Sequence, residues 1–158
     1  MRRLAAAVAL TLLLGGCGVQ TSGVTPAGRA PTGVAPGVTL YFVDRDGRLR
    51  PQLRRTGRLG TIPEAMALLL TGVGDAPLRS EIAPAGPTRV VATTAPGLIR
   101  LMVPLTIDDV TPRGIDQLVC TALGVHVQRG GSTSTRVQIR FVQPTPQSRV
   151  RRTCPLIP

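Results

Sequence analysis

"TPRGIDQLVCTALG" (Thr111–Gly124) is the stretch that decides the fold, because it predicts a helix with one strongly apolar face. Thr111 is a typical N-cap residue, and Pro112 is well tolerated in the first turn of a helix. The apolar side chains recur at helical spacing along a single stripe: Ile115, Leu118, Val119, Ala122 and Leu123. Gly124 is expected to end this helix.

A shorter helix is predicted upstream, from Thr61 to Gly72. Thr61 and Glu64 are spaced as a capping box, and Gly72 is a typical residue just past a helix end. The apolar side chains again share one face: Ile62, Met66, Leu69 and Leu70. Both helices therefore need a sheet to cover their apolar stripes.

Strands are predicted on both sides of the shorter helix. Val38–Asp44 is apolar on both faces, which is typical of a buried strand. After an Asp-Gly turn, Arg48–Arg55 alternates and contains Pro51, which predicts an edge strand. Arg89–Pro104 predicts a hairpin that turns at Ala95–Gly97.

Two more strands are expected after the longer helix. Val125–Gln128 predicts a short strand, and Arg136–Gln143 alternates cleanly. The inward side chains of the second strand are Val137, Ile139 and Phe141. This order of elements predicts an α+β fold, with a mostly antiparallel sheet and two helices packed on one face.

The N-terminus has the pattern of a secretion signal. Two arginines follow Met1, and the apolar run Leu4–Leu14 is too short to span a bilayer, which takes roughly 20 helical residues. Leu14-Gly15-Gly16-Cys17 resembles a bacterial lipobox, in which the cysteine thiol receives a diacylglyceryl group. We therefore expect a lipoprotein signal peptide at residues 1–16 and a lipid anchor on Cys17. A plain signal peptide with a chance cysteine is the alternative.

The segment 17–37 is expected to tether a folded domain, 38–158, to that anchor. It is rich in Gly, Pro and Thr and has no hydrophobic periodicity, which is typical of a flexible linker. The expected location is the extracytoplasmic face of the cell membrane. Outside the reducing cytosol a disulfide between Cys120 and Cys154 is favoured, with a metal pair or free thiols as alternatives. Cys120 lies on the helix flank, where a returning tail could reach it.

The net charge is +11, and all 19 basic residues are arginines. A GC-rich genome is the simpler explanation, and attraction to anionic lipids or wall polymers is the functional one. The chain lacks the aromatic platforms of single-strand binders, so nucleic acid is not an expected partner. The candidate contacts are the arginines of the edge strand and of the tail: Arg48, Arg50, Arg54, Arg55, Arg149, Arg151 and Arg152.

Four segments, in order, resemble the GerMN domain of sporulation and germination proteins: "VTLYFVDRDGRLRPQLRR", "TIPEAMALLLTG", "GLIRLMVPLTIDD" and "GIDQLVCTAL". Together with the lipobox they resemble the GerMN-type lipoproteins of actinobacteria. The resemblance implies a non-catalytic α+β module in envelope assembly, spore formation or germination, or a partner of sensor kinases. It carries over no ligand-binding residues.

The residues themselves form no recognisable catalytic, cofactor or metal motif. His126 is expected in a strand with a structural role, Asp44 and Asp46 flank a turn, and Asp108 and Asp109 precede a helix. The favoured function is a tethered interaction module that binds an envelope protein or an anionic wall polymer. A wall hydrolase or small-ligand receptor is the alternative, and it would gather Asp108, Asp109 or His126 in a deep pocket with a shifted pKa.

Overall fold

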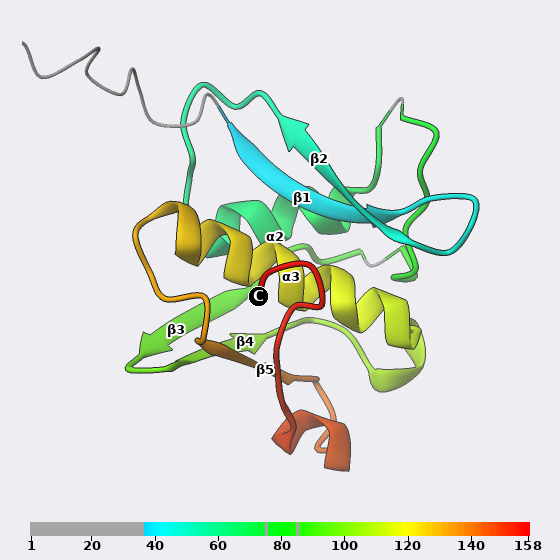
Figure 1. The fold of residues 1–158 in the computed structure, drawn as a ribbon. Coiled ribbons are helices and arrows are strands. Elements are labelled where there is room, and N and C mark those ends of the chain that lie inside the picture. Colours follow the sequence, from blue (N-terminus) through cyan, green and yellow to red (C-terminus); the bar gives the residue numbers. More distant parts are fainter. Residues whose placement is uncertain (1–36, 75, 85) are drawn as a thin grey trace, which may run out of the picture. The chain divides into compact units, whose positions relative to one another are not determined.

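The computed structural model describes residues 37–74, 76–84 and 86–158. Two helices and two sheets give an α+β fold, which confirms the predicted class (Figure 1). The predicted signal peptide, Cys17 and all of the predicted linker except Gly37 lie outside the described residues. Among the described helices, none is long and apolar enough to cross a membrane.

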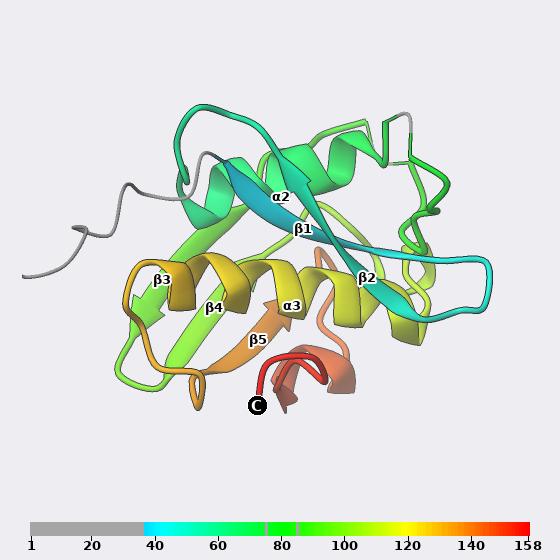
Figure 2. The same cartoon turned by 45° about the horizontal axis from the view of Figure 1, so that its top comes forward.

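Helix α3 (Pro112–Gln128) lies between a β-hairpin and a larger sheet, as both views of the fold show (Figures 1 and 2). The Thr111 side chain accepts a hydrogen bond from the N–H of Gly114 and caps the helix, as predicted. Most side chains from Gly114 to Val125 are buried, not only those of the predicted stripe. A helix buried nearly all round must be covered on more than one side.

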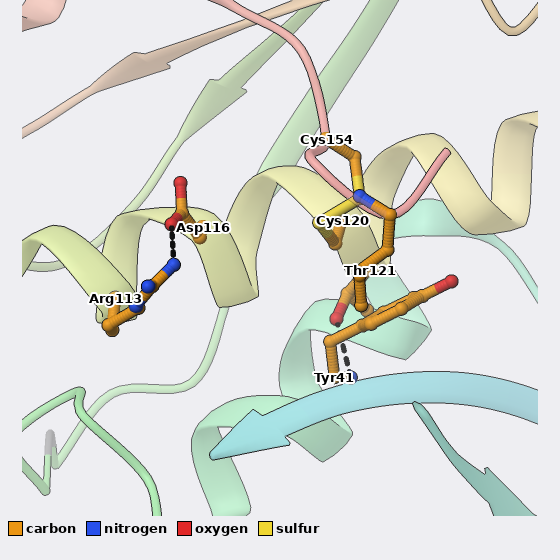
Figure 3. The surroundings of a disulfide bond; sticks show 7 residues. Tyr41, Arg113, Asp116, Cys120, Thr121 and Cys154 are labelled. Atoms are coloured by element: carbon orange, nitrogen blue, oxygen red, sulfur yellow. Dashed lines mark hydrogen bonds and ion pairs between the residues drawn. A yellow bond between two sulfur atoms is a disulfide. The ribbon is translucent and has the colours of Figure 1, made fainter. Parts of the chain in front are cut away.

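The hairpin of β1 (Val38–Val43) and β2 (Leu49–Arg54) covers one side of α3. β1 is buried along most of its length, as its sequence predicts. Two polar side chains of α3 bind its backbone. The N–H of Tyr41 donates to Thr121 Oγ1 at 3.1 Å (Figure 3). Gln117 Nε2 donates to the Tyr41 carbonyl at 3.0 Å. These buried hydrogen bonds fix the hairpin on the helix, because breaking them would leave polar groups unsatisfied.

The larger sheet has the order β3 (Val91–Ala95), β4 (Leu98–Met102), β5 (Arg136–Arg140) and β6 (Arg151–Arg152). β4 and β5 pair in parallel, because α3 crosses over between them, and the other two pairs are antiparallel. The inner face of this sheet contributes four fully buried side chains to the core: Ile99, Leu101, Val137 and Ile139.

Helix α2 (Ile62–Thr71) packs against α3 and β1. The predicted capping box between Thr61 and Glu64 is present, and the chain leaves the helix at Gly72 with a φ of 107°. The predicted hairpin turn is also confirmed, since β3 ends at Ala95 and β4 begins at Leu98.

Two predictions at the end of α3 are wrong. The segment Val125–Gln128 is helical rather than a strand, and Gly124 does not end the helix. A Cβ on Gly124 would lie 3.4 Å from the ring of Tyr41, which is an ordinary van der Waals contact, so Gly124 packs against β1 within the helix. The helix ends near Gly130, which has a φ of 85°.

The arrangement of strands also differs in detail from the prediction. The strands divide into two sheets with α3 between them, whereas one mostly antiparallel sheet with both helices on one face is predicted. The strand predicted over Arg136–Gln143 ends at Arg140, although Phe141 still points into the core. The strands form two sheets because β1 and β2 pair with each other, not with the strands of the larger sheet, and cover α3 from the opposite side.

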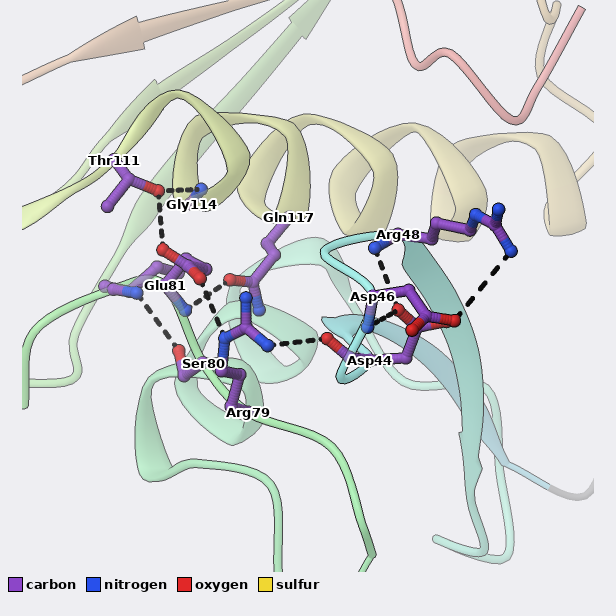
Figure 4. Close-up of polar contacts among 10 residues, drawn as sticks. Asp44, Asp46, Arg48, Arg79, Ser80, Glu81, Thr111, Gly114 and Gln117 are labelled. Carbon is purple, nitrogen blue, oxygen red and sulfur yellow. Dashed lines mark hydrogen bonds and ion pairs between the residues drawn. The ribbon is translucent and has the colours of Figure 1, made fainter.

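The irregular segment 76–84 holds the N-terminal end of α3 (Figure 4). The N–H of Glu81 donates to Gln117 Oε1 at 2.7 Å, and Thr111 Oγ1 donates to Glu81 Oε2 at 3.0 Å. A Cβ on Gly114 would lie 2.2 Å from the carbonyl oxygen of Glu81. Only glycine permits this close approach of the segment to the helix.

A disulfide between Cys120 and Cys154 ties the C-terminal tail to α3, which confirms the predicted pair (Figure 3). The two residues are 34 positions apart, and their Cα atoms lie 4.7 Å apart. Both side chains are buried, so the crosslink is part of the core rather than a surface clasp.

Replacing both cysteines with alanine (Cys120→Ala/Cys154→Ala) is expected to lower the free energy of unfolding by roughly 4 kcal/mol, since the crosslink restricts the unfolded chain. Urea titration of the full chain measures this difference. A reducing agent should destabilise the unmodified protein by a similar amount and leave the variant unchanged. Equal stability of the two oxidised proteins would contradict a structural role for the disulfide.

Candidate functional site

Acidic and basic residues are separated along the chain. All eight Asp and Glu residues lie between Asp44 and Asp116, and none follows. None lies between Ile82 and Ile107 either, so the larger sheet contains no acidic residue. The strands of this sheet and the segments that flank them carry seven arginines: Arg89, Arg100, Arg136, Arg140, Arg149, Arg151 and Arg152.

Strand pairing places several of these arginines on the outer face of the larger sheet, away from α3. Arg100 pairs with Gln138, and Gln138 pairs with Arg151, so the three side chains form one row across β4, β5 and β6. The spacing of neighbouring strands puts Arg100 and Arg151 about 10 Å apart. Arg136 and Arg140 lie on β5 to either side of this row.

A groove of about 850 Å³ lies at one end of the outer face. Its floor includes the neighbouring side chains Val91, Met102 and Arg140 of β3, β4 and β5. The segment 142–149 forms the wall that faces the sheet, and this segment ends in the short helix η2 (Pro146–Arg149). The groove is hollowed between a sheet and a loop, and it is open to solvent.

The loop wall of the groove is held in place by the sheet and by the tail. Gln138 Nε2 donates to the carbonyl of Ser148 at 2.8 Å, and the N–H of Phe141 donates to Ser148 Oγ at 3.4 Å. β6 then pairs with β5, and the disulfide at Cys154 anchors the chain that follows. The disulfide therefore helps to position the groove as well as to stabilise the fold.

Apolar side chains are unusually exposed inside this groove. Val91, Met102 and Val142 line it with exposed fractions of 48%, 55% and 59%. They make up half of the six large apolar side chains that are exposed among the described residues. Clustered exposed apolar side chains with a polar rim are typical of interaction sites.

The positive charge around the groove has no internal partner. Arg89, Arg140 and Arg149 line it, and among the described residues no carboxylate lies within 4.0 Å of their guanidinium groups. An arginine can bind a carboxylate or a phosphate through two parallel hydrogen bonds. The groove therefore suits a ligand that carries both negative charge and apolar groups.

Two of the arginines predicted as contacts are paired within the hairpin. Arg50 Nε lies 2.7 Å from Asp44 Oδ2, and Arg48 Nη1 lies 3.9 Å from Asp46 Oδ2. The hydrogen bond from Arg50, followed by that from the N–H of Arg48, holds the pKa of Asp44 below its usual value. Arg50 in particular stabilises the turn of the hairpin through Asp44.

The other predicted arginines lie in different settings. Arg54 Nη2 donates to the carbonyls of Gly72 and Val73 and so clamps the end of α2. Arg55 is exposed on the hairpin side. In the tail, Arg149 lines the groove and Arg151 lies on the outer face, whereas Arg152 donates to the side chain of Gln147.

Four basic residues were not predicted as contacts: Arg100, Arg136 and Arg140 of the larger sheet, and Arg89 just before β3. The alternation of "LIRLM" and "RVQIR" and the absence of acidic residues after Asp116 were the available signals. Neither signal shows that the two segments lie side by side, because a parallel pair joins strands that are far apart in sequence.

The structure does not bring together the candidate acid-base residues. Asp109 precedes α3 and accepts a hydrogen bond from the N–H of Thr106, which lowers the pKa of Asp109. His126 lies in the last turn of α3, and its Nε2 is 3.2 Å from the hydroxyl of Thr135. A 17-residue helix separates the two sites by about 25 Å. Neither residue lines the groove.

No family model, curated protein or solved structure matches the chain. Within the described ranges, no three His, Cys, Asp or Glu side chains are grouped so that they could hold a metal ion. What the groove can bind follows from its own chemistry, because both arginines and exposed apolar side chains line it.

The neighbours Arg54 and Arg55 offer a matched comparison of a structural and a surface arginine. Arg54→Ala is expected to lower the free energy of unfolding by about 1–2 kcal/mol, because two carbonyls at the end of α2 lose a charged donor. Arg55→Ala is expected to change it by less than about 0.5 kcal/mol. Urea titration of both variants measures the difference, and equal losses would show that the clamp contributes nothing.

Proposed function

We propose that this protein is a membrane-anchored extracytoplasmic lipoprotein whose folded part is a non-catalytic interaction module for an anionic partner in the cell envelope. The observation that supports it most is the outer face of the larger sheet, which carries exposed arginines and no acidic residue. Such a surface attracts anions and is available to a partner, because the core lies on its opposite side.

The lipobox at Cys17 supplies the anchor in this proposal. A flexible linker of about 20 residues has a mean reach of roughly 25 Å, so the module would work close to the membrane surface. The resemblance to GerMN-type lipoproteins favours a role in envelope assembly, sporulation or signalling. A disulfide in the core suits an exported protein.

The direction of two pKa shifts, those of Glu64 and Asp109, supports a structural rather than a catalytic role for these two residues. The hydrogen bond from the N–H of Thr61 is the main cause that lowers the pKa of Glu64, and that from the N–H of Thr106 is the main cause that lowers the pKa of Asp109. A general acid that works near neutral pH needs the opposite shift. Glu64 caps α2, and Asp109 caps the three-residue 3₁₀-helix η1 (Ile107–Asp109), so both carry the charge that a helix N-terminus favours.

Recovery of partners from chemically cross-linked envelopes tests the proposal. The wild-type protein is expected to recover an anionic protein or wall polymer. The double variant Arg100→Glu/Arg140→Glu is expected to lose this partner. Arg45→Glu/Arg55→Glu changes the net charge equally on the hairpin side and should retain the partner. Equal recovery by all three proteins, or no recovery, would contradict the proposal. Hydrolysis of peptidoglycan by the purified chain would favour an enzyme instead.

A further inference from the structure

We propose that the groove between the outer face of the larger sheet and the segment 142–149 binds an extended segment of a partner protein that presents both acidic and apolar side chains on one face. The inference rests on the proposed function and deepens it, because it names the class of partner and the place where it binds. Four features of the groove support it: its charge, its exposed apolar side chains, the spacing of its strands and the contacts that hold its loop wall.

The charge of the groove requires a negative ligand. Arg89, Arg140 and Arg149 come from three different parts of the chain and converge on one cavity. Since no acidic residue lies in the larger sheet or the tail, the repulsion between these guanidinium groups is not relieved from nearby strands. Carboxylates of a partner would relieve it and would form charge-assisted hydrogen bonds with the arginines.

The apolar side chains distinguish a protein segment from a polymer or a membrane. A hydrophilic phosphate polymer would pair with the arginines but would leave Val91, Met102 and Val142 in water. A membrane surface contacts protruding residues, whereas these three side chains line a hollow. Arginine and methionine are enriched at protein interfaces, and both residue types line this groove.

The spacing of the groove suits an extended chain. Val91, Met102 and Arg140 are successive neighbours across three strands, which lie about 4.8 Å apart. In an extended segment, residues two positions apart point to the same side at a separation of about 6.7 Å. One residue can therefore place an apolar side chain on Met102 while the next on that side places a carboxylate at Arg140.

The groove is already formed before a ligand binds. The hydrogen bond from Gln138 to Ser148 and the pairing of β6 fix the loop wall against the sheet. Cys154 is crosslinked to the buried helix α3 only a few residues further on. A rigid groove loses little conformational freedom on binding, which favours recognition of a short segment.

Selection from a displayed library of random twelve-residue peptides, with the full chain purified in detergent as bait, tests the inference. The enriched peptides are expected to combine Asp or Glu with apolar residues. Arg140→Ser and Met102→Ser should each weaken binding of a synthetic enriched peptide by about tenfold or more. Arg55→Ser and Leu53→Ser are matched exposed controls on the hairpin and should change the affinity by less than about twofold.

Parallel binding assays with poly(glycerol phosphate) and with phosphatidylglycerol vesicles distinguish failure of the inference from failure of the proposed function. If either binds with dependence on Arg140 but not on Met102, and no acidic peptide is enriched, the inference is wrong while the proposed function stands. If peptide, polymer and vesicle all fail to bind, both are contradicted. Enriched peptides that bind all four variants equally would also overturn the inference. Thermal unfolding of each variant confirms that it is folded.

Discussion

The burial of α3 on two sides is the constraint on which the rest of the structure depends. Its interior side chains include Gln117 and Thr121, and a buried polar group needs a hydrogen-bond partner. The backbone of Tyr41 on β1 and the N–H of Glu81 supply those partners. The hairpin and the segment 76–84 are therefore specified by the polar residues of the helix, and not only by its apolar stripe.

This arrangement leaves the outer face of the larger sheet free and determines its charge. Several acidic residues have partners within the fold. Asp44 accepts hydrogen bonds at the hairpin turn, Glu64 caps α2, and Asp109 caps the short 3₁₀-helix η1. Glu81 joins Arg79 to Thr111. The arginines of β4, β5 and the tail have no such partners in their own sheet. An uncompensated basic surface with exposed apolar side chains is costly to keep unless it has a partner, and this links the fold to the proposed role.

Local signals in the sequence predicted much of the fold, since both helix starts, the Pro96-Gly97 turn and the buried β1 depend on neighbouring residues. The errors concern non-local packing. Gly124 is typical of a residue that ends a helix, but in the structure it contacts Tyr41. Val125 is β-branched, and its burial in the core favours continuation of the helix despite its low helix propensity. Alternation places Arg54 and Arg55 on opposite faces of the predicted strand, but it does not show that Arg54 binds the carbonyls of Gly72 and Val73. The groove could not be predicted from the sequence, because it depends on the parallel pairing of β4 with β5, which no local sequence pattern indicates.

The central claim is that this protein meets its partner through the outer face of the larger sheet. Site-specific photo-crosslinking in living cells tests it most directly, with a photoreactive amino acid at position 102 or at position 53. The two native side chains are similarly exposed, at 55% for Met102 on the sheet and 48% for Leu53 on the hairpin. We expect a discrete crosslinked product from position 102 and none from position 53. A product from position 53 alone would contradict the account.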